Sequence, residues 1–202
     1  MPRQGLNRDA VVRAAANLIE EKGPAAFSMA ALAKFLHVRT ASLYNHVDSL
    51  QDLYTQVGLL AIRQMVDAEE QAISGKYRED ALTALAEAYR AFARDHYHLY
   101  RMILAAPKQE NPVLEEASFA IVRPIHQVLE EFGVRGAQAV HWQRLLRSFM
   151  HGFAAHEIAG GFSHVPLGRD ESYRIALEWI AAGLRAAAEE GNHACQNNGS
   201  YR

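Results

Sequence analysis

The sequence predicts an all-α protein in which a small N-terminal head joins a larger helical body. Apolar residues recur at the three-and-four spacing of buried helix faces along most of the chain, and no segment alternates with the period of a strand. Half of the 202 residues are apolar, which is enough for a sizeable core. We therefore expect a head at 1–48, a body at 49–190 and a disordered polar tail at 191–202.

The head should contain three helices. Asn7 is a suitable N-cap for the first, and Gly23-Pro24 ends it. Ser28 can cap a second, short helix that runs to about Leu36, because its hydroxyl can accept hydrogen bonds from the free amides of the first turn. If the segment after this helix is also helical, the chain contains two short helices joined by a tight turn.

Residues 40–46 are expected to form that third helix, with Leu43 and Val47 turned back onto the second. This arrangement is a helix-turn-helix, whose second helix reaches base edges in the major groove of double-stranded DNA. The distribution of charge weakly favours DNA binding by the head. Residues 1–50 carry six basic and four acidic side chains, whereas residues 51–202 carry 15 basic and 19 acidic ones. The predicted DNA-binding residues are Ser28, Arg39, Thr40, Ser42, Tyr44, Asn45 and His46.

The first fifty-five or so residues resemble the TetR family of bacterial repressors. The family has a Leu-Tyr step, a phosphate-contacting residue and then a long capped helix, which correspond here to Leu43, Tyr44, His46 and a helix opening at Ser49. Isolated capped helices also form ordinary helical hairpins, but the joint pattern at the N-terminus favours DNA binding. The resemblance implies a homodimer that reads a palindromic operator.

Three positions depart from the family pattern. His37 stands where the family usually has a glycine, so the backbone there either avoids positive φ or accepts it at a cost. Leu50 replaces a lysine poised for a phosphate, so one contact per half-site is expected to be missing. Val47 replaces a phenylalanine and keeps an apolar plug.

The body is expected to be a bundle of about six helices. Pro112 favours the first position of one helix and Gly133 its end, while Pro124 falls in its interior. Such a proline would kink the helix and free the carbonyl of Ala120. The expected helices span 49–74, 79–95, 96–105, 111–132, 135–160 and 170–190.

The body also resembles the ligand-binding half of TetR-type regulators, in particular a subgroup with Leu99-Tyr100-Arg101 and His151-Gly152. This resemblance implies a repressor that a small, largely apolar molecule releases from DNA. A kinked helix beside His126 leaves room for such a ligand, although core packing is the ordinary role of each candidate. The candidate ligand-binding residues are Tyr89, Phe92, Met102, Phe119, Val122, His126, Trp142 and Leu146.

Dimerisation is assigned to the last two long helices, because one reading helix alone discriminates too weakly against a genome. An apolar seam on these helices would supply the contact area. The predicted interface residues are Phe149, Phe153, Tyr173, Leu177, Ile180 and Leu184.

The spacing of histidines and glutamates does not match a zincin or a di-metal bundle enzyme. No catalytic residue, cofactor or metal is therefore expected. His156-Glu157 lacks the second histidine of a zincin, because Gly160 stands there. The only Glu-x-x-His spacing, Glu190 to His193, cannot build a di-metal bundle. No apolar run suits a membrane span or a signal peptide, which predicts a cytoplasmic protein without a membrane partner. The alternative is a helical interaction module or an orphan helical enzyme that kept the head for packing.

Overall fold

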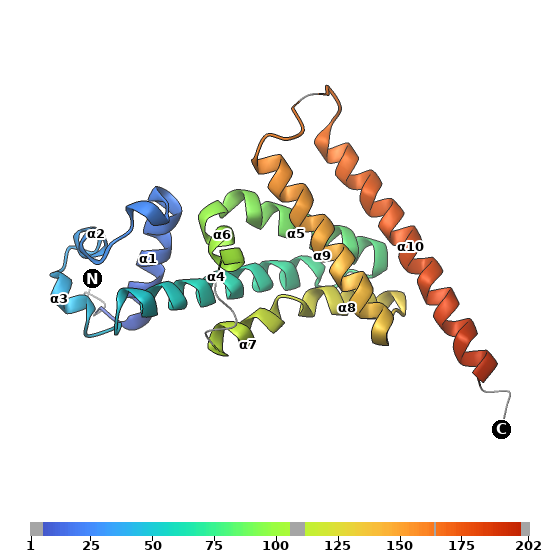
Figure 1. Cartoon of the computed structure of the whole chain (residues 1–202), viewed down its shortest axis with the longest axis horizontal. Coiled ribbons are helices and arrows are strands. Elements are labelled where there is room, and N and C mark those ends of the chain that lie inside the picture. Colours follow the sequence, from blue (N-terminus) through green and yellow to red (C-terminus); the bar gives the residue numbers. More distant parts are fainter. Residues whose placement is uncertain (1–5, 106–111, 164, 199–202) are drawn as a thin grey trace. The chain divides into compact units, whose positions relative to one another are not determined.

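The computed structural model describes residues 6–105, 112–163 and 165–198, which form helices and turns without a strand. The expected all-α class is therefore confirmed. Every helix predicted for the head and body has a counterpart in Figure 1. The elements are α1 (Arg8–Lys22), η1 (Pro24–Ala26), α2 (Met29–Phe35), α3 (Thr40–Leu43), α4 (Leu50–Ile73), α5 (Arg78–Asp95), α6 (Tyr97–Ala105), α7 (Pro112–Ala120), α8 (Arg123–Phe132), α9 (Gly136–Ile158) and α10 (Arg169–Asn198).

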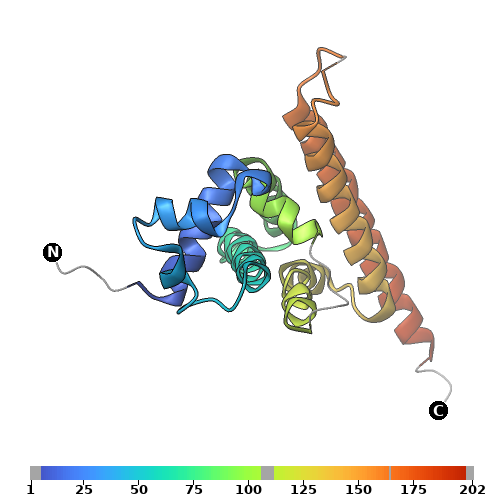
Figure 2. The same cartoon turned by 60° about the vertical axis from the view of Figure 1, so that its left-hand side comes forward.

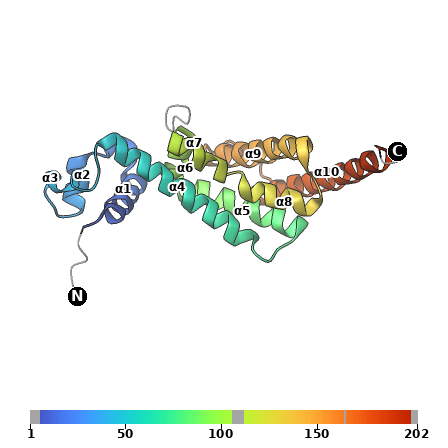
Figure 3. The same cartoon turned by 90° about the horizontal axis from the view of Figure 1, so that it is seen from below.

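The chain divides into two compact units. The N-terminal unit comprises Met1–Met65 and Asp95–Ala120, and the C-terminal unit comprises Val66–Arg94 and Ile121–Arg202. The first unit therefore contains α6, α7 and most of α4 in addition to the three head helices. Because α4 is one uninterrupted helix, it contributes residues to both units (Figure 3).

The N-terminal unit begins its helices as the sequence predicts. Asn7 Oδ1 accepts a hydrogen bond from the Ala10 amide at 2.8 Å, and Ser28 Oγ accepts one from the Ala31 amide at 3.1 Å. Ser49 Oγ accepts from the Asp52 amide at 3.0 Å at the start of α4. Each cap satisfies an amide that has no partner inside its own helix.

A contact that the sequence did not indicate holds α6 to α1. The two carboxylate oxygens of Glu20 accept hydrogen bonds from the amides of His98 and Leu99, at 3.2 and 3.1 Å. A negative group is favoured there, because the first turn of a helix presents unpaired N–H groups. Nearby, Gly23 has a φ of +77°, and a side chain on it would lie 3.2 Å from the His98 ring. The head helices and α6 thus pack as one unit.

The C-terminal unit is built from α5, α8, α9, α10 and the end of α4. Figure 2 shows α9 and α10 lying side by side along most of their length. The Tyr173 hydroxyl of α10 donates to the Ala86 carbonyl of α5 at 2.8 Å. Leu85, Val128 and Leu184 are fully buried, so the core lies between α5, α8 and α10.

The predicted kinked helix at 111–132 is wrong. The chain turns at residues 121–122 and forms two helices, α7 and α8, with Pro124 in the first turn of α8. Proline suits that position, because the amide it lacks would have no partner in a first turn. Gly133 ends α8 in the left-handed conformation with a φ of +86°, as expected. Pro124 therefore starts a helix, and no interior kink exists to open a cavity.

Two other boundaries differ from the expectations. The third head helix is shorter than predicted, since residues 44–46 form a turn after α3. The last helix is longer, since α10 continues to Asn198 and includes most of the segment expected to be a tail. Among the described residues, no helix is both long and apolar enough to cross a membrane.

Candidate DNA-binding and effector sites

The helix-turn-helix is held together by its buried apolar residues. Leu43 and Val47 are 0% and 1% exposed, and both pack into the same unit as Leu32 of α2. The turn between α2 and α3 passes through His37, whose φ is +56°. The Val38 amide donates to the Ala33 carbonyl at 3.0 Å, which closes the end of α2. His37 thus adopts the left-handed conformation that favours glycine, at a cost of about 1 kcal/mol.

The polar residues around α3 remain available to a partner. Arg39, Thr40, Tyr44 and Asn45 are exposed, and Ser42 and His46 are half-buried. Tyr44 is 52% exposed, so its side chain is accessible to a partner. Ser28 is exposed too, although its oxygen already caps α2. All seven predicted DNA-binding side chains therefore keep solvent-facing surface.

Asp52 fixes the beginning of α4, next to this segment. Its carboxylate accepts two hydrogen bonds from Arg8, at 3.0 and 3.1 Å, and one from the Asp48 amide at 3.1 Å. Leu50, the first residue of α4, is 37% exposed and provides no donor for a phosphate. The sequence did not indicate this ion pair between Arg8 and Asp52, because two residues 44 positions apart leave no local pattern.

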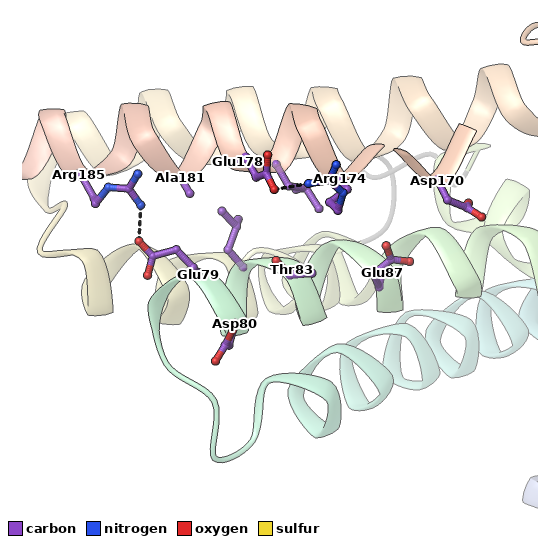
Figure 4. A pocket seen from close by; sticks show the side chains of 11 residues that line it. Glu79, Asp80, Thr83, Glu87, Asp170, Arg174, Glu178, Ala181 and Arg185 are labelled. Carbon is purple, nitrogen blue, oxygen red and sulfur yellow. Dashed lines mark hydrogen bonds and ion pairs between the residues drawn. The ribbon is translucent and has the colours of Figure 1, made fainter. Parts of the chain in front are cut away.

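A charged groove lies between α5 and α10 in the C-terminal unit (Figure 4). It encloses about 530 Å³, and ion pairs join Arg185 to Glu79 and Arg174 to Glu178. Figure 4 shows that most of the labelled side chains around it are charged. Such a lining does not suit a largely apolar ligand.

Arg90 of α5 is a buried cation at the centre of a structural cluster. It donates to the Glu157 carboxylate at 2.7 and 2.6 Å and to Asp170 at 2.7 Å. Its guanidinium also lies 4.8 Å from the ring centroid of Tyr173. The hydrogen bonds from Arg90 lower the pKa of Glu157, and burial raises the pKa of Tyr173. The cluster joins α5, α9 and α10.

A smaller and more apolar pocket lies where α9 connects to α10. It encloses about 250 Å³ and includes Phe153, Phe162 and Leu167 in its lining. Phe153 was predicted at a dimer interface, and here it packs 4.6 Å from the ring centroid of Tyr173. None of the predicted ligand-binding residues lines this pocket.

The candidate ligand-binding residues fall into both units. Met102 and Phe119 belong to the N-terminal unit, and Phe119 is 70% exposed. The other six belong to the C-terminal unit, where three are buried and three half-buried. The buried ones are Tyr89, Phe92 and Leu146, and the half-buried ones are Val122, His126 and Trp142.

His126 and Trp142 both have partners in the C-terminal unit. His126 Nε2 lies 2.7 Å from Gln143 Oε1, a hydrogen bond between α8 and α9. Trp142 packs against the backbone of α10 at Gly183, where a side-chain carbon would lie only 2.7 Å from the indole. A glycine is required there for this close approach.

Three residues of the predicted dimer seam are buried within a single chain. Tyr173, Leu177 and Leu184 are 0%, 3% and 0% exposed within a single chain, so they have no surface to offer a second copy. Phe149, Phe153 and Ile180 are half-buried. Tyr173 hydrogen-bonds to Ala86 of α5, and α10 also contacts α8 of the same chain. The helix α10 carries a buried and an exposed set of apolar residues, and the predicted interface was built on the buried set.

The outer stripe of α9 and α10 is exposed. Trp179 is 74% exposed and Leu145 46%, and Ala182 and Ala186 are also exposed. On α10 the spacing of Trp179, Ala182 and Ala186 is that of one helix face. The signal in the sequence was Trp179, a large apolar residue outside the buried stripe.

Within the described ranges, no group of three or more metal-ligating side chains could hold an ion.

Comparison with known proteins agrees with this architecture. Residues 11–57 match the family described as bacterial regulatory proteins, tetR family, and residues 82–180 match the tetracyclin repressor-like C-terminal domain. The HTH-type transcriptional regulator YobS of Bacillus subtilis is 33% identical over 153 residues, which cover 75% of this chain and 79% of that protein.

Two solved structures share the fold. A protein from Rhodococcus sp. RHA1 has a TM-score of 0.79 and 22% identity, with 91% of this chain and 98% of that chain covered. ActR from Streptomyces coelicolor, in complex with actinorhodin, has a TM-score of 0.64 and 20% identity, with 91% and 99% covered.

Proposed function

The chain belongs to the TetR family of bacterial transcriptional regulators, and we propose that it is a repressor released from a palindromic operator by a small, largely apolar molecule. Family membership makes it a DNA-binding regulator and not an enzyme. The observation that carries the proposal is the third helix, α3. Its buried Leu43 anchors it to α2, while polar side chains beside it stay exposed.

The exposed residues divide by chemistry into readers and positioners. Asn45 can pair with the two adjacent hydrogen-bonding groups of an adenine, and Thr40 can reach a base edge. Tyr44 and His46 are suited to phosphates, which fix the register of the protein without reading sequence. Arg39, at the N-cap of α3, can serve either purpose.

Two copies must act together, because each chain has one short reading helix. Exposed apolar residues on α9 and α10, among them Leu145 and Trp179, support a two-fold dimer through these helices, since exposed apolar surface can mark an interaction site. In such a dimer the two reading helices would sit about 34–36 Å apart, or at a multiple of this distance. This proposal replaces the inner seam that the sequence suggested.

An effector in the C-terminal unit would act through α4, which contributes residues to both units. ActR, a fold relative, is known in complex with actinorhodin, which supports an organic ligand for this chain as well. The aromatic residues Tyr89, Phe92 and Trp142, with the His126–Gln143 pair, offer apolar surface and polar atoms. The effector must bind one tilt of α4 better than another, since equal affinity for both shifts nothing.

A gel-shift experiment with the DNA beside the protein's own gene tests DNA reading. Asn45→Ala should weaken specific binding by roughly 1–3 kcal/mol and leave binding to random DNA unchanged. Asn17→Ala, which removes an exposed asparagine from α1, serves as the matched control and should bind as the wild type does. Equal losses of affinity on both DNAs would show that Asn45 contacts the DNA backbone and not a base. Wild-type protein that does not bind the fragment specifically would contradict the proposed role as its regulator.

A further inference from the structure

The pocket where α9 connects to α10 has mainly apolar walls. Phe153 and Phe162 form one part of its lining, and their ring centroids lie 4.7 Å apart. Val165 and Leu167 form another part and are 59% and 70% exposed, although both are large apolar residues. Apolar surface around a hollow is removed from water when an apolar molecule enters it, which favours binding. The walls therefore suit the apolar part of a small molecule.

One cation completes the lining of this pocket. Arg169, the first residue of α10, belongs to the lining, and its side chain is 53% exposed. Its ion pair with Glu157 spans 3.7 Å, and among the described residues its guanidinium donates no hydrogen bond. The other polar side chain of the lining, Ser172, already donates its hydroxyl to the Gly168 carbonyl at 3.3 Å. Since a guanidinium has five N–H groups, Arg169 has unused donors at the pocket.

The carboxylates near Arg169 are bound to a different arginine. Glu157 accepts hydrogen bonds from Arg90 at 2.7 and 2.6 Å, and Asp170 accepts one from Arg90 at 2.7 Å. Arg90 is buried, so a carboxylate that moved from Arg90 to Arg169 would leave a buried cation short of a partner. Arg169 therefore keeps its donors for an acceptor from outside the chain.

We propose that this pocket binds a small apolar monocarboxylate, whose carboxylate pairs with Arg169 and whose hydrocarbon part lies against the apolar walls. A carboxylate can accept two parallel N–H bonds from one guanidinium, and such charge-assisted bonds are stronger than neutral ones. An ammonium would meet a like charge at Arg169, and a phosphate dianion would bring two negative charges close to Glu157.

The size of the pocket limits the size of the acid. Its volume of about 250 Å³ lies just below the range in which pockets hold drug-sized ligands. An acid with a single aromatic ring or a short alkyl chain is therefore the expected class, and a long acyl chain is not.

This site is separate from the effector site proposed above. None of the eight candidate ligand-binding residues lines the pocket. Its lining belongs to α9, α10 and the connection between them, all in the C-terminal unit. The inference thus goes beyond the proposed function, and its test needs no operator DNA. A result on this pocket neither supports nor contradicts DNA reading.

Three probes test the two parts of the site in the full-length protein. Phenylpropanoate has an aromatic ring and a carboxylate, phenylpropanamide has the same skeleton without the charge, and acetate has the carboxylate alone. Calorimetry at pH 7 should show phenylpropanoate binding about tenfold more tightly than phenylpropanamide, because only the anion forms charge-assisted hydrogen bonds. Acetate should also bind about tenfold more weakly than phenylpropanoate, because it buries little apolar surface.

Substitutions at Arg169 test the role of the cation. Arg169→Gln should weaken phenylpropanoate binding about tenfold and leave phenylpropanamide within about twofold, so that the preference for the anion disappears. Arg169→Lys keeps the charge and should retain part of this preference. Arg174→Gln is the matched control, because Arg174 is an exposed arginine of the same helix that lines the groove between α5 and α10. It should bind all three probes as the wild type does.

A substitution at Leu167 tests the apolar wall. Leu167→Ser should weaken phenylpropanoate binding about fivefold and leave acetate binding unchanged, because only the larger probe buries apolar surface there. Leu104→Ser is the matched control, since Leu104 is an exposed leucine of α6 in the N-terminal unit. Both leucines are exposed, so both variants should fold as the wild type does.

The proposal is overturned by any of three results. Wild-type protein that does not bind phenylpropanoate lacks the site. Equal affinities of the wild type and Arg169→Gln for phenylpropanoate would show that Arg169 does not hold the carboxylate. Binding by Trp179→Glu, which is expected to be a monomer, but not by the wild type would show that a second copy of the chain fills the pocket.

Discussion

The two units of this protein treat their polar groups in different ways. In the N-terminal unit, side-chain oxygens of Asn7, Ser28, Ser49 and Glu20 each accept from a backbone amide at the start of a helix. In the C-terminal unit, Arg90 is fully engaged, but Glu69 is buried without a partner for Oε2. The helix starts of the N-terminal unit are thus capped by side-chain oxygens, whereas the C-terminal unit contains a buried carboxylate oxygen that no hydrogen bond satisfies.

The largest expected effects distinguish the two apolar stripes of α10. Leu184→Glu should abolish folding, because it places an unpaired charge in the core of the C-terminal unit. Trp179→Glu should keep the helical circular dichroism signal of the wild type and yield a monomer in light scattering. A Trp179→Glu protein that stays dimeric would show that the outer stripe is not the interface.

A substitution at Arg90 tests how much the C-terminal unit depends on its buried cation. Arg90→Met leaves the Glu157 carboxylate, which is 13% exposed, without its main partner. Removing one member of a buried pair costs about 3–5 kcal/mol, so denaturant unfolding should occur at a much lower midpoint. Arg174→Met, which breaks the exposed pair with Glu178, is the control and should change stability by less than about 1 kcal/mol. Similar losses in both variants would contradict the structural importance of the Arg90 cluster.

The sequence predicted the head better than the body for a physical reason. Caps such as Ser28 and Ser49 act over three residues, so their effect is visible in the local pattern. The identity of a helix's packing partner is not local, and this is why the stripe containing Leu177 was assigned to a second copy. Pro124 was misplaced because one residue suits both a helix interior kink and a first turn, and only the surrounding packing decides between them.

The smallest expected effect concerns the turn of the helix-turn-helix. His37→Gly removes the strain of a side chain at a φ of +56° and should stabilise the N-terminal unit by about 0.5–1 kcal/mol. Thermal unfolding would detect this as a rise of a few degrees. His46→Gly introduces the same residue at a position without positive φ and should destabilise instead. A stabilisation by both variants would indicate that the strain at His37 is not the cause.

DNA footprinting on the intergenic fragment tests the central claim most directly, because it reports reading and dimer geometry together. The account predicts two protected half-sites related by a palindrome, with centres about one helical turn or a multiple of it apart. Both half-sites should lose protection together in Trp179→Glu, because the single reading helix of a monomer discriminates too weakly between DNA sequences. A single protected patch, or a footprint unchanged in the Trp179→Glu monomer, would contradict a dimer that reads DNA through α3.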